Sequence, residues 1–378
     1  MKLLSRLVAL VLASLGLAQQ QTRTVEVVDL EGTPYERGLT HGQALKQQIA
    51  ALLPFFERDL ADRSELSAAE FVTWFLESTR YGDAIRRHTP DLLDEVRGIA
   101  AGAGQPFETM LVYQLVDEYW VQSMMRRAEK CTSLGIARRD AQPTLVAQNL
   151  DIPAWMHRYP TVLRIHHSDS ELQSLVVTVP GLIGAMGVNS GRVALAVNTI
   201  LPLEPCRDGL PVAFVVRGAL ARPDVTAARE FVHSVRHASG QAYTIGGPDD
   251  VTCHECSANA VVRFVPAGGP ERVWHTNHPV ASDDYAGWLA RAMAADGRKI
   301  TDYGARCSRF AAIERGLAGD GPCGVEEIVA LLSDPGHEVC NASTYACVVM
   351  SLGDLPALRI TPGAPNVAEF TTVGFAAR

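Results

Sequence analysis

The sequence predicts an α+β protein in which a mainly helical N-terminal segment precedes a strand-rich region. Two patterns carry this prediction. From residue 22 to about 128, apolar residues recur at the spacing of a helix. After Cys131, short runs rich in Val, Ile and Thr are bounded by Gly, Pro, Asn and Asp, which is typical of strands. Because these strands cluster apart from the first helices, layered α+β packing is favoured over a doubly wound parallel sheet.

The first eighteen residues have the layout of a secretory signal peptide. Lys2 and Arg6 form a short basic region, and the apolar run Leu7 to Leu17 leads to small residues ending at Ala18. An apolar run of 11 residues is too short for a membrane anchor, which needs roughly 20. We therefore expect cleavage after Ala18 and a secreted or periplasmic protein with no stable membrane anchor. That compartment permits disulfides.

The helical segment is expected to open with a strand at 24–30 and a turn at Gly32-Thr33-Pro34. Four helices should follow. They are predicted at 35–56, after a capping box at Ser67–Glu70, from Thr89-Pro90 to about Gly102–Gly104, and at 109–125.

The strand-rich region is expected to combine seven strands with four further helices. Strand-like runs lie at 144–150, 161–166, 172–179, 193–201, 242–245, 260–265 and 346–352. Helices are predicted at 224–237, 284–296, 306–317 and 325–333.

Charge and cysteine content limit the classes of partner and cofactor. The 34 Lys and Arg residues against 42 Asp and Glu residues give a net charge of −8 without a basic run, so nucleic acid is not an expected partner. Eight cysteines are too few for a disulfide scaffold in 378 residues, but enough for several disulfides, a metal site or one distinct cysteine. The run Cys253-His254-Glu255-Cys256 holds a single C-x-x-C pair followed by Ser257. Since this fits neither zinc nor c-type haem, no metal or other cofactor is predicted.

Cys131 is the candidate nucleophile, because it lies at the junction of the two regions and precedes an ordered series of polar motifs. On spacing alone, a buried strand cysteine would be the better interpretation. The motifs that change this balance are Gln148-Asn149-Leu150-Asp151, Gly187-Val188-Asn189-Ser190-Gly191, a strand ending at Asn198, Thr276-Asn277-His278-Pro279, and Ser308-Arg309.

In this order the motifs resemble the acyl-CoA:6-aminopenicillanate acyltransferase family of N-terminal-nucleophile (Ntn) hydrolases. Gly38-Leu39-Thr40-His41-Gly42 resembles its Gly-x-x-His-Gly, and Glu95 to Ile99 resembles its Glu-x-x-Gly-Ile helix. Cys340 and 344–352 resemble its C-terminal strands, so nearly the whole mature chain is covered. One departure is Lys130, where the family commonly has Gly. The resemblance implies an αββα sandwich of two mainly antiparallel sheets between helical layers.

An N-terminal cysteine carries its own base, because the α-amine has a reference pKa of about 7.7–8.0. Cleavage between Lys130 and Cys131 would expose it. The thiol attacks the Lys130 carbonyl, the acyl group moves to sulfur, and water releases the upstream chain. We therefore expect a zymogen that becomes a heterodimer of 19–130, the helical segment, and 131–378, the catalytic core.

The resemblance also implies roles for further residues. Asp151 would hydrogen-bond the new α-amine, Asn277 would donate to the oxyanion, and Arg309 would support the nucleophile or bind a carboxylate. The alternatives are turn residues for Asp151 and Asn277 and a solvent-facing helix position for Arg309. The weaker candidates are for substrate binding: Asn149, Asn189 and Asn198. His41 and His278 are interpreted as structural hydrogen-bonding residues.

The function that follows is an amidohydrolase or N-acyltransferase that cleaves a small-molecule amide through a Cys131 thioester. Hydrolysis is favoured, since acyl-CoA is scarce outside the cytosol. Candidate substrates are N-acyl amino acids, β-lactam side chains, aminoacyl amides and bile-salt-like conjugates. Two alternatives remain: an unprocessed cysteine hydrolase with a Cys-His pair, and a non-catalytic secreted binding protein on a degenerate Ntn scaffold.

Overall fold

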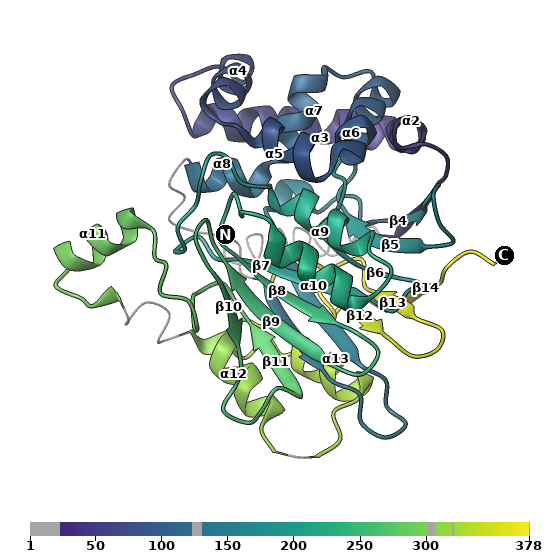
Figure 1. Cartoon of the computed structure of the whole chain (residues 1–378), viewed down its shortest axis with the longest axis vertical. Helices are drawn as coiled ribbons and strands as arrows, with labels where there is room; N and C mark the ends of the chain where they lie inside the picture. Colours follow the sequence, from purple (N-terminus) through teal and green to yellow (C-terminus); the bar gives the residue numbers. More distant parts are fainter. Residues whose placement is uncertain (1–22, 123–130, 301–306, 320, 378) are drawn as a thin grey trace, which may run out of the picture.

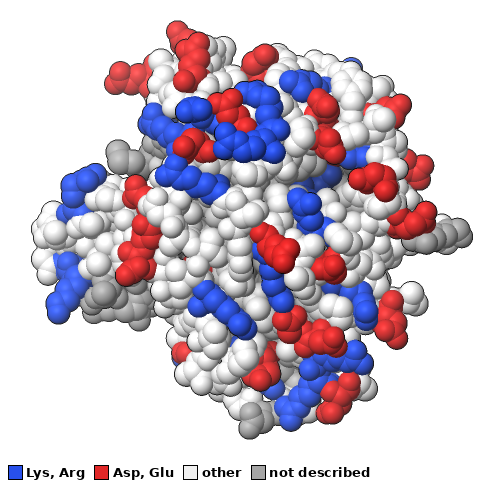
Figure 2. Space-filling model, viewed as in Figure 1, with Lys and Arg blue, Asp and Glu red and all other residues white. Residues whose placement is uncertain are grey.

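The computed structural model describes residues 23–122, 131–300, 307–319 and 321–377. The predicted signal peptide and Lys130 lie outside these residues. Two sheets stack face to face, and helices cover the outer face of each, so the predicted α+β sandwich is confirmed (Figure 1). In the described part of the chain, no helix is both long and apolar enough to cross a bilayer. Acidic and basic side chains are interspersed over the face shown in Figure 2.

The larger sheet has eight strands, and all neighbours are antiparallel except β1 and β4. Its strands in spatial order are β1 (Glu26–Leu30), β4 (Thr161–His166), β5 (Gln173–Thr178), β6 (Met186–Asn189), β7 (Ala194–Thr199), β8 (Gln241–Gly246), β9 (Val251–Cys256) and β10 (Val261–Phe264).

The smaller sheet has six antiparallel strands and carries the candidate nucleophile. Its order is β11 (Arg272–His275), β2 (Thr132–Ile136), β3 (Leu145–Asp151), β12 (Thr344–Ser351), β13 (Ala357–Ile360) and β14 (Thr371–Val373). β2 and β3 pair so that Thr132 lies opposite Asn149. This register brings Cys131, just before β2, beside Asp151 at the end of β3, although 20 residues separate them.

Nine helices among the described residues belong to the layer outside the larger sheet. They are α2 (Pro34–Ala44), α3 (Lys46–Asp62), α4 (Ala68–Ser78), α5 (Tyr81–His88), α6 (Pro90–Ala103), α7 (Phe107–Tyr113), α8 (Val116–Gln122), α9 (Val212–Leu220) and α10 (Val225–Ser234). The smaller sheet is covered by α12 (Ser308–Leu317) and α13 (Val325–Leu332). A short 3-10 helix, η1 (Ala154–Met156), follows β3, and α11 (Gly287–Ala295) projects at the side of the sandwich (Figure 1).

Helices α2 and α6 pack backbone against backbone through glycines. A Cβ at Gly38 would clash with the carbonyl of Glu95, and a Cβ at Gly98 with that of Tyr35. The motifs around His41 and Glu95 are therefore structural. Glu95 is fully buried and bonds Arg217 at 2.7 and 3.0 Å.

Two predicted helices are each divided in the structure. The prediction at 35–56 becomes α2 and α3, which meet at Leu45. Helical hydrogen bonds continue through this residue, from Leu45 to His41 and from Ile49 to Leu45, so apolar periodicity does not reveal the kink. The prediction at 109–125 becomes α7 and α8, and residues 123–125 lie outside the described part of the chain. Between the two helices the main chain changes to tighter bonds, from the Gln114 N–H to Leu111 and from the Leu115 N–H to Val112, while the Gln114 side chain bonds the main chain of Gly181 and Ile183.

Candidate active site

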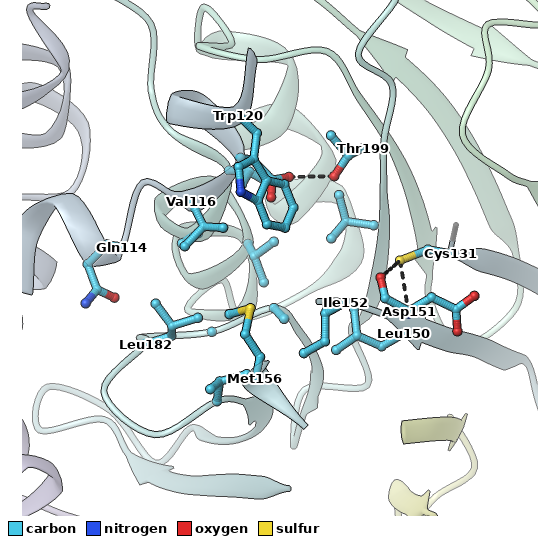
Figure 3. Close-up of a pocket in the computed structure, with 18 residues that line it drawn as sticks. Gln114, Val116, Trp120, Cys131, Leu150, Asp151, Ile152, Met156, Leu182 and Thr199 are labelled. Carbon is cyan, nitrogen blue, oxygen red and sulfur yellow. Dashed lines mark hydrogen bonds between the residues drawn. The ribbon is translucent and has the colours of Figure 1, made fainter. Parts of the chain in front are cut away.

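Cys131 lies buried between the two sheets at the start of β2, with 7% of its surface exposed. Its Sγ accepts a hydrogen bond from the Asp151 N–H at 3.4 Å and lies 3.5 Å from the Asp151 carbonyl oxygen (Figure 3). Burial raises the pKa of the thiol to about 12, and the charges of Asp151 and Asp117 add to this effect. In the uncleaved chain the thiol is therefore protonated at neutral pH and needs a base before it can act as a nucleophile.

Arg309 joins the nucleophile to α12. The side chain is buried, and Nη1 donates to the Cys131 carbonyl oxygen at 2.5 Å and to Thr132 Oγ1 at 2.9 Å. Nη2 donates to Asn277 Oδ1 at 3.1 Å. The alternative of a solvent-facing helix arginine is thus excluded, and a planar guanidinium suits this multiple contact better than an ammonium.

Asn277 follows β11, and both ends of its amide are oriented. Oδ1 accepts from Arg309, while Nδ2 donates to the Thr199 carbonyl oxygen at 2.9 Å. Because a primary amide carries two N–H groups, Nδ2 keeps a second donor besides the bond to Thr199. The residue is half-buried.

Glu255 on β9 holds the loop that carries Asn277. Its carboxylate accepts from His275 Nε2 at 2.7 Å and from the main-chain N–H groups of Val280, Ala281 and Ser282 at 2.6, 3.1 and 2.6 Å. Burial opposes ionisation, but these hydrogen bonds leave the pKa of Glu255 lowered overall. A buried carboxylate thus fixes residues 275–282 as one unit.

Asp151 contacts Cys131 through its main chain rather than its carboxylate. Oδ2 accepts from Asn341 Nδ2 at 3.0 Å. In Figure 3 the carboxyl group points away from the apolar side chains that face the sulfur. Asp151 therefore lies beside the candidate nucleophile, while its bond to a new α-amine stays a prediction.

Two of the candidate substrate-binding residues are occupied by main-chain bonds elsewhere, so their positions do not support that role. Asn149 donates to the Leu332 and Val339 carbonyls. Asn189 donates to the Leu220 and Arg222 carbonyls and ties the end of α9 to a turn. A polar residue in a motif can serve the backbone as readily as a ligand, which sequence alone does not distinguish.

Asn198, the third candidate, lies closer to the nucleophile, in the layer between the sheets. Its Oδ1 accepts from Ser133 Oγ on β2, two residues after Cys131. It does not line the cavity described next, so it supports β2 rather than contacting a substrate there.

An apolar cavity of about 100 Å³ adjoins Cys131. Figure 3 shows apolar side chains from several elements facing one another around it. These include Val116, Trp120, Leu150, Ile152, Met156, Leu182, Val197 and Val212. Such a lining accommodates the hydrocarbon part of a small ligand rather than a charged group.

Asp117 on α8 is an acidic group in this lining that sequence reasoning missed. Its Oδ2 accepts from Thr199 Oγ1 at 2.5 Å and from Gln241 Nε2 at 3.0 Å. Burial raises the pKa of the carboxyl group against these two bonds. Because Thr199 also accepts from Asn277, hydrogen bonds connect Asp117 through Thr199, Asn277 and Arg309 to Cys131.

All eight cysteines are free thiols, and Cys307 lies near the site. It precedes α12 and lies 3.5 Å from Thr276 Oγ1. Burial raises its pKa, but hydrogen bonds with His278 and Thr276 outweigh this and lower the pKa to about 6. His278 therefore interacts with Cys307. Within the described ranges, no three His, Cys, Asp or Glu side chains are arranged to hold a metal ion.

Comparison with known proteins assigns the chain to a family. The model of the acyl-coenzyme A:6-aminopenicillanic acid acyl-transferase family matches residues 138–347, more than half of the chain. The 40 kDa form of acyl-coenzyme A:6-aminopenicillanic-acid-acyltransferase from Emericella nidulans is 25% identical over 254 residues, which is 66% of this chain and 68% of that protein. Protein dcd1A from Dictyostelium discoideum is 28% identical over 109 residues, a quarter of each chain.

Three solved structures are similar in part. The N-acylethanolamine-hydrolyzing acid amidase ortholog of Caenorhabditis elegans has a TM-score of 0.43 and 16% identity, and the match covers 65% of this chain and all of that one. Penicillin V acylase from Agrobacterium tumefaciens has a TM-score of 0.36, 10% identity, and coverage of 65% and 86%. A mutant conjugated bile acid hydrolase from Clostridium perfringens has a TM-score of 0.38, 12% identity, and coverage of 64% and 92%.

The family match confirms the resemblance drawn from the motifs and the expected enzyme class, an acyltransferase or amide hydrolase. On this evidence the chain belongs to the acyl-coenzyme A:6-aminopenicillanic acid acyl-transferase family.

Proposed function

We propose that this chain is a self-processing amidohydrolase that cleaves a small-molecule amide with Cys131 as its nucleophile. The observation that carries the proposal is the position of Cys131. Its thiol adjoins an apolar cavity, and its carbonyl is held by Arg309, which also orients Asn277. Nucleophile, oxyanion donor and acyl cavity thus lie within one connected group of side chains.

Processing begins with attack of the Cys131 thiol on the Lys130 carbonyl carbon. The peptide C–N bond breaks, the acyl group moves to sulfur, and the thiol proton ends on the new amine. Water then hydrolyses the thioester and leaves Lys130 with a carboxylate. The products are chains 19–130 and 131–378. Because burial raises the pKa of Cys131 to about 12 in the intact chain, the thiol attacks in its protonated form and passes its proton to the scissile nitrogen as the C–N bond breaks.

Catalysis then uses the free α-amine of Cys131 as the base. The amine takes the thiol proton, and the thiolate attacks the substrate amide carbon. Asn277 Nδ2 donates to the oxyanion, a contribution worth roughly 10²–10³ in rate. The amine product leaves with the proton from the α-amine, and water hydrolyses the acyl thioester. Asp151 orients the α-amine through its position beside Cys131.

The acyl group bound beside Cys131 is proposed to be apolar, because hydrocarbon side chains dominate the cavity. Export through the predicted signal peptide would place the enzyme outside the cytosol, where water is the abundant acyl acceptor. We therefore propose hydrolysis as the main reaction and aminolysis as a minor one.

The decisive experiment is intact mass and N-terminal sequencing of the purified protein, followed by incubation with N-acyl amides. We expect an N-terminus at Cys131 and release of amine. Cys131→Ala should remain one chain and be inactive. Cys206→Ala is the matched control, since this half-buried thiol contacts the His237 carbonyl away from the cavity, and it should process normally. Two fragments from the Cys131→Ala variant would refute self-processing.

The two alternatives give different outcomes. An active chain that stays intact indicates a Cys-His hydrolase, and a processed chain with an inert Cys131 indicates a binding protein. Alkylation by iodoacetamide must be measured in a Cys307→Ser background. Otherwise the lowered pKa of Cys307 would supply a reactive thiol that is not the proposed nucleophile.

A further inference from the structure

A polar furrow, separate from the Cys131 cavity, lies on the outer face of the larger sheet. Its lining residues belong to α10, β9 and β10, with Asp250 just before β9, and these elements are labelled in Figure 1. β10 is the edge strand of this sheet. Thr252 and His254 alternate on β9, and Arg263 on β10 is the cross-strand partner of His254. None of its lining residues lines the catalytic cavity, so it is an independent feature.

Two buried polar groups line this furrow without a protein partner. Thr252 and His254 are each 5% exposed. Within the described residues, Thr252 Oγ1 and His254 Nε2 have no hydrogen-bond partner. An unsatisfied buried donor or acceptor is unfavourable. Both atoms belong to side chains that line the furrow.

The charges around the furrow favour an anion. Arg229 makes a two-fold ion pair with Asp250 at 2.7 and 2.9 Å, so the acidic group is neutralised. Arg263 is exposed, and its side chain forms no ion pair or hydrogen bond within the described residues. One positive charge therefore remains uncompensated beside His254.

The two histidines of the furrow are neutral at pH 7. Burial and the charges of His233, Arg229 and Arg263 lower the pKa of His254 to about 3. Burial and Arg229 also lower the pKa of His233, whose ring centroid lies 4.5 Å from that of His254. A neutral imidazole donates from one nitrogen and accepts at the other. Such groups suit a ligand that carries both O–H and oxygen acceptors.

We propose that this furrow binds a small phosphate-type oxyanion, held by Arg263, the Thr252 hydroxyl and the His254 ring. The oxygens of a hydrogenphosphate can accept hydrogen bonds from Arg263 and Thr252. Towards His254 the ion can accept a hydrogen bond through an oxygen or donate one through its O–H group. A metal ion fits less well. The uncompensated charge of Arg263 repels it, and no third ligand joins the histidine pair within the described part of the chain.

Calorimetric titration of the processed protein with inorganic phosphate at pH 7, at constant ionic strength in chloride, tests this proposal. We expect saturable binding at one site. Arg263→Gln should weaken it at least fivefold, because the variant removes the uncompensated charge. Arg87→Gln, at an exposed position on α5, should bind like the wild type. His254→Gln keeps a neutral polar group at this position and should weaken binding less than Arg263→Gln.

Phenyl phosphate in competition separates the two sources of the anion. Tighter binding than inorganic phosphate assigns the site to an organic phosphate, and weaker binding assigns it to the free ion. The proposal is overturned if wild type and Arg263→Gln bind phosphate with equal affinity, or if neither saturates. Either result means an adventitious ion only. Amide hydrolysis should be unchanged in Arg263→Gln, so this outcome is independent of the Cys131 chemistry.

Discussion

Arg309 donates a hydrogen bond of 2.5 Å to the main-chain carbonyl oxygen of Cys131, although 178 positions separate them. The bond attaches the first turn of α12 to the start of β2. The same guanidinium reaches Thr132 and Asn277, so one side chain sets the relation between the nucleophile and the oxyanion donor. Its geometry should therefore matter more than its charge.

Replacing Arg309 by Lys should lower kcat about a hundredfold while KM changes little. An ammonium group is a single point donor and cannot bridge the Cys131 carbonyl and Asn277 together. Steady-state kinetics on the processed variant measures this. Arg315→Lys, at an exposed position of the same helix, should behave as the wild type. Equal kcat values for Arg309→Lys and the wild type would contradict the bridging role.

Asn277→Ala should lower kcat by roughly 10²–10³ with KM nearly unchanged, because it removes the proposed oxyanion donor and leaves the apolar cavity intact. Single-turnover kinetics of thioester formation reports this step directly. Asn259→Ala, an exposed asparagine that bonds Asp284, provides the matched control. A rise in KM with constant kcat would instead indicate a substrate-binding role.

Glu255→Gln should reduce kcat without contacting the substrate. The carboxylate accepts hydrogen bonds from the main-chain N–H groups of residues 280–282. A glutamine would place its own N–H₂ donors against some of these groups, so the loop that carries Asn277 would lose its fixed position. Losing a buried charge-assisted network costs about 3 kcal/mol. Steady-state kinetics well below the melting temperature separates the loss of kcat from the loss of stability. A variant with lower Tm but normal kcat would show that Glu255 serves stability alone.

The order of polar motifs predicts much of the site, because strands and loops bring those segments to one place. Cys131, Asp151, Asn277 and Arg309 come from four separate segments, and hydrogen bonds join them in the structure, while their catalytic roles stay predictions. The long-range partners could not be predicted. Asp117 reads in sequence as an ordinary first-turn acid of a helix. Only the packing of α8 against β7 shows that it bonds Thr199.

The fold class is predictable for a similar reason: strand-rich and helical patterns are separated along the chain. The errors fall where periodicity carries no information. Residues 212–220 are nearly all apolar, so a helix and a strand look alike there, and α9 was missed. β9 is absent from the predicted strands, because His254 and Glu255 interrupt its apolar pattern.

Gly98→Ala should destabilise the protein by about 3 kcal/mol. The new methyl group would meet the Tyr35 carbonyl, and two packed helix backbones have little room to separate. Urea denaturation measures the change. Gly82→Ala on α5 is the control, because its Cβ would meet only the Arg86 side chain at 3.5 Å. That variant should gain up to about 1 kcal/mol from helix propensity. Similar values for both variants would argue against close helix contact.

Glu118→Gln should remove a pH-dependent loss of stability. Burial and the nearby charge of Asp117 raise the pKa of Glu118 from 4.5 to about 7. Between these values the folded chain binds a proton that the unfolded chain has released. The stabilisation is therefore complete below pH 4.5 and is lost as the pH rises through 7, by about 3 kcal/mol in total.

Glutamine at position 118 keeps the acceptor for the Val212 N–H at 3.0 Å and the Ser239 hydroxyl at 2.8 Å, and it has no charge to bury. Denaturation curves at pH 5 and pH 8 should thus differ less for Glu118→Gln than for the wild type. The exposed Glu108→Gln variant should follow the wild type, and a Glu118→Gln variant that also follows it would contradict the raised pKa.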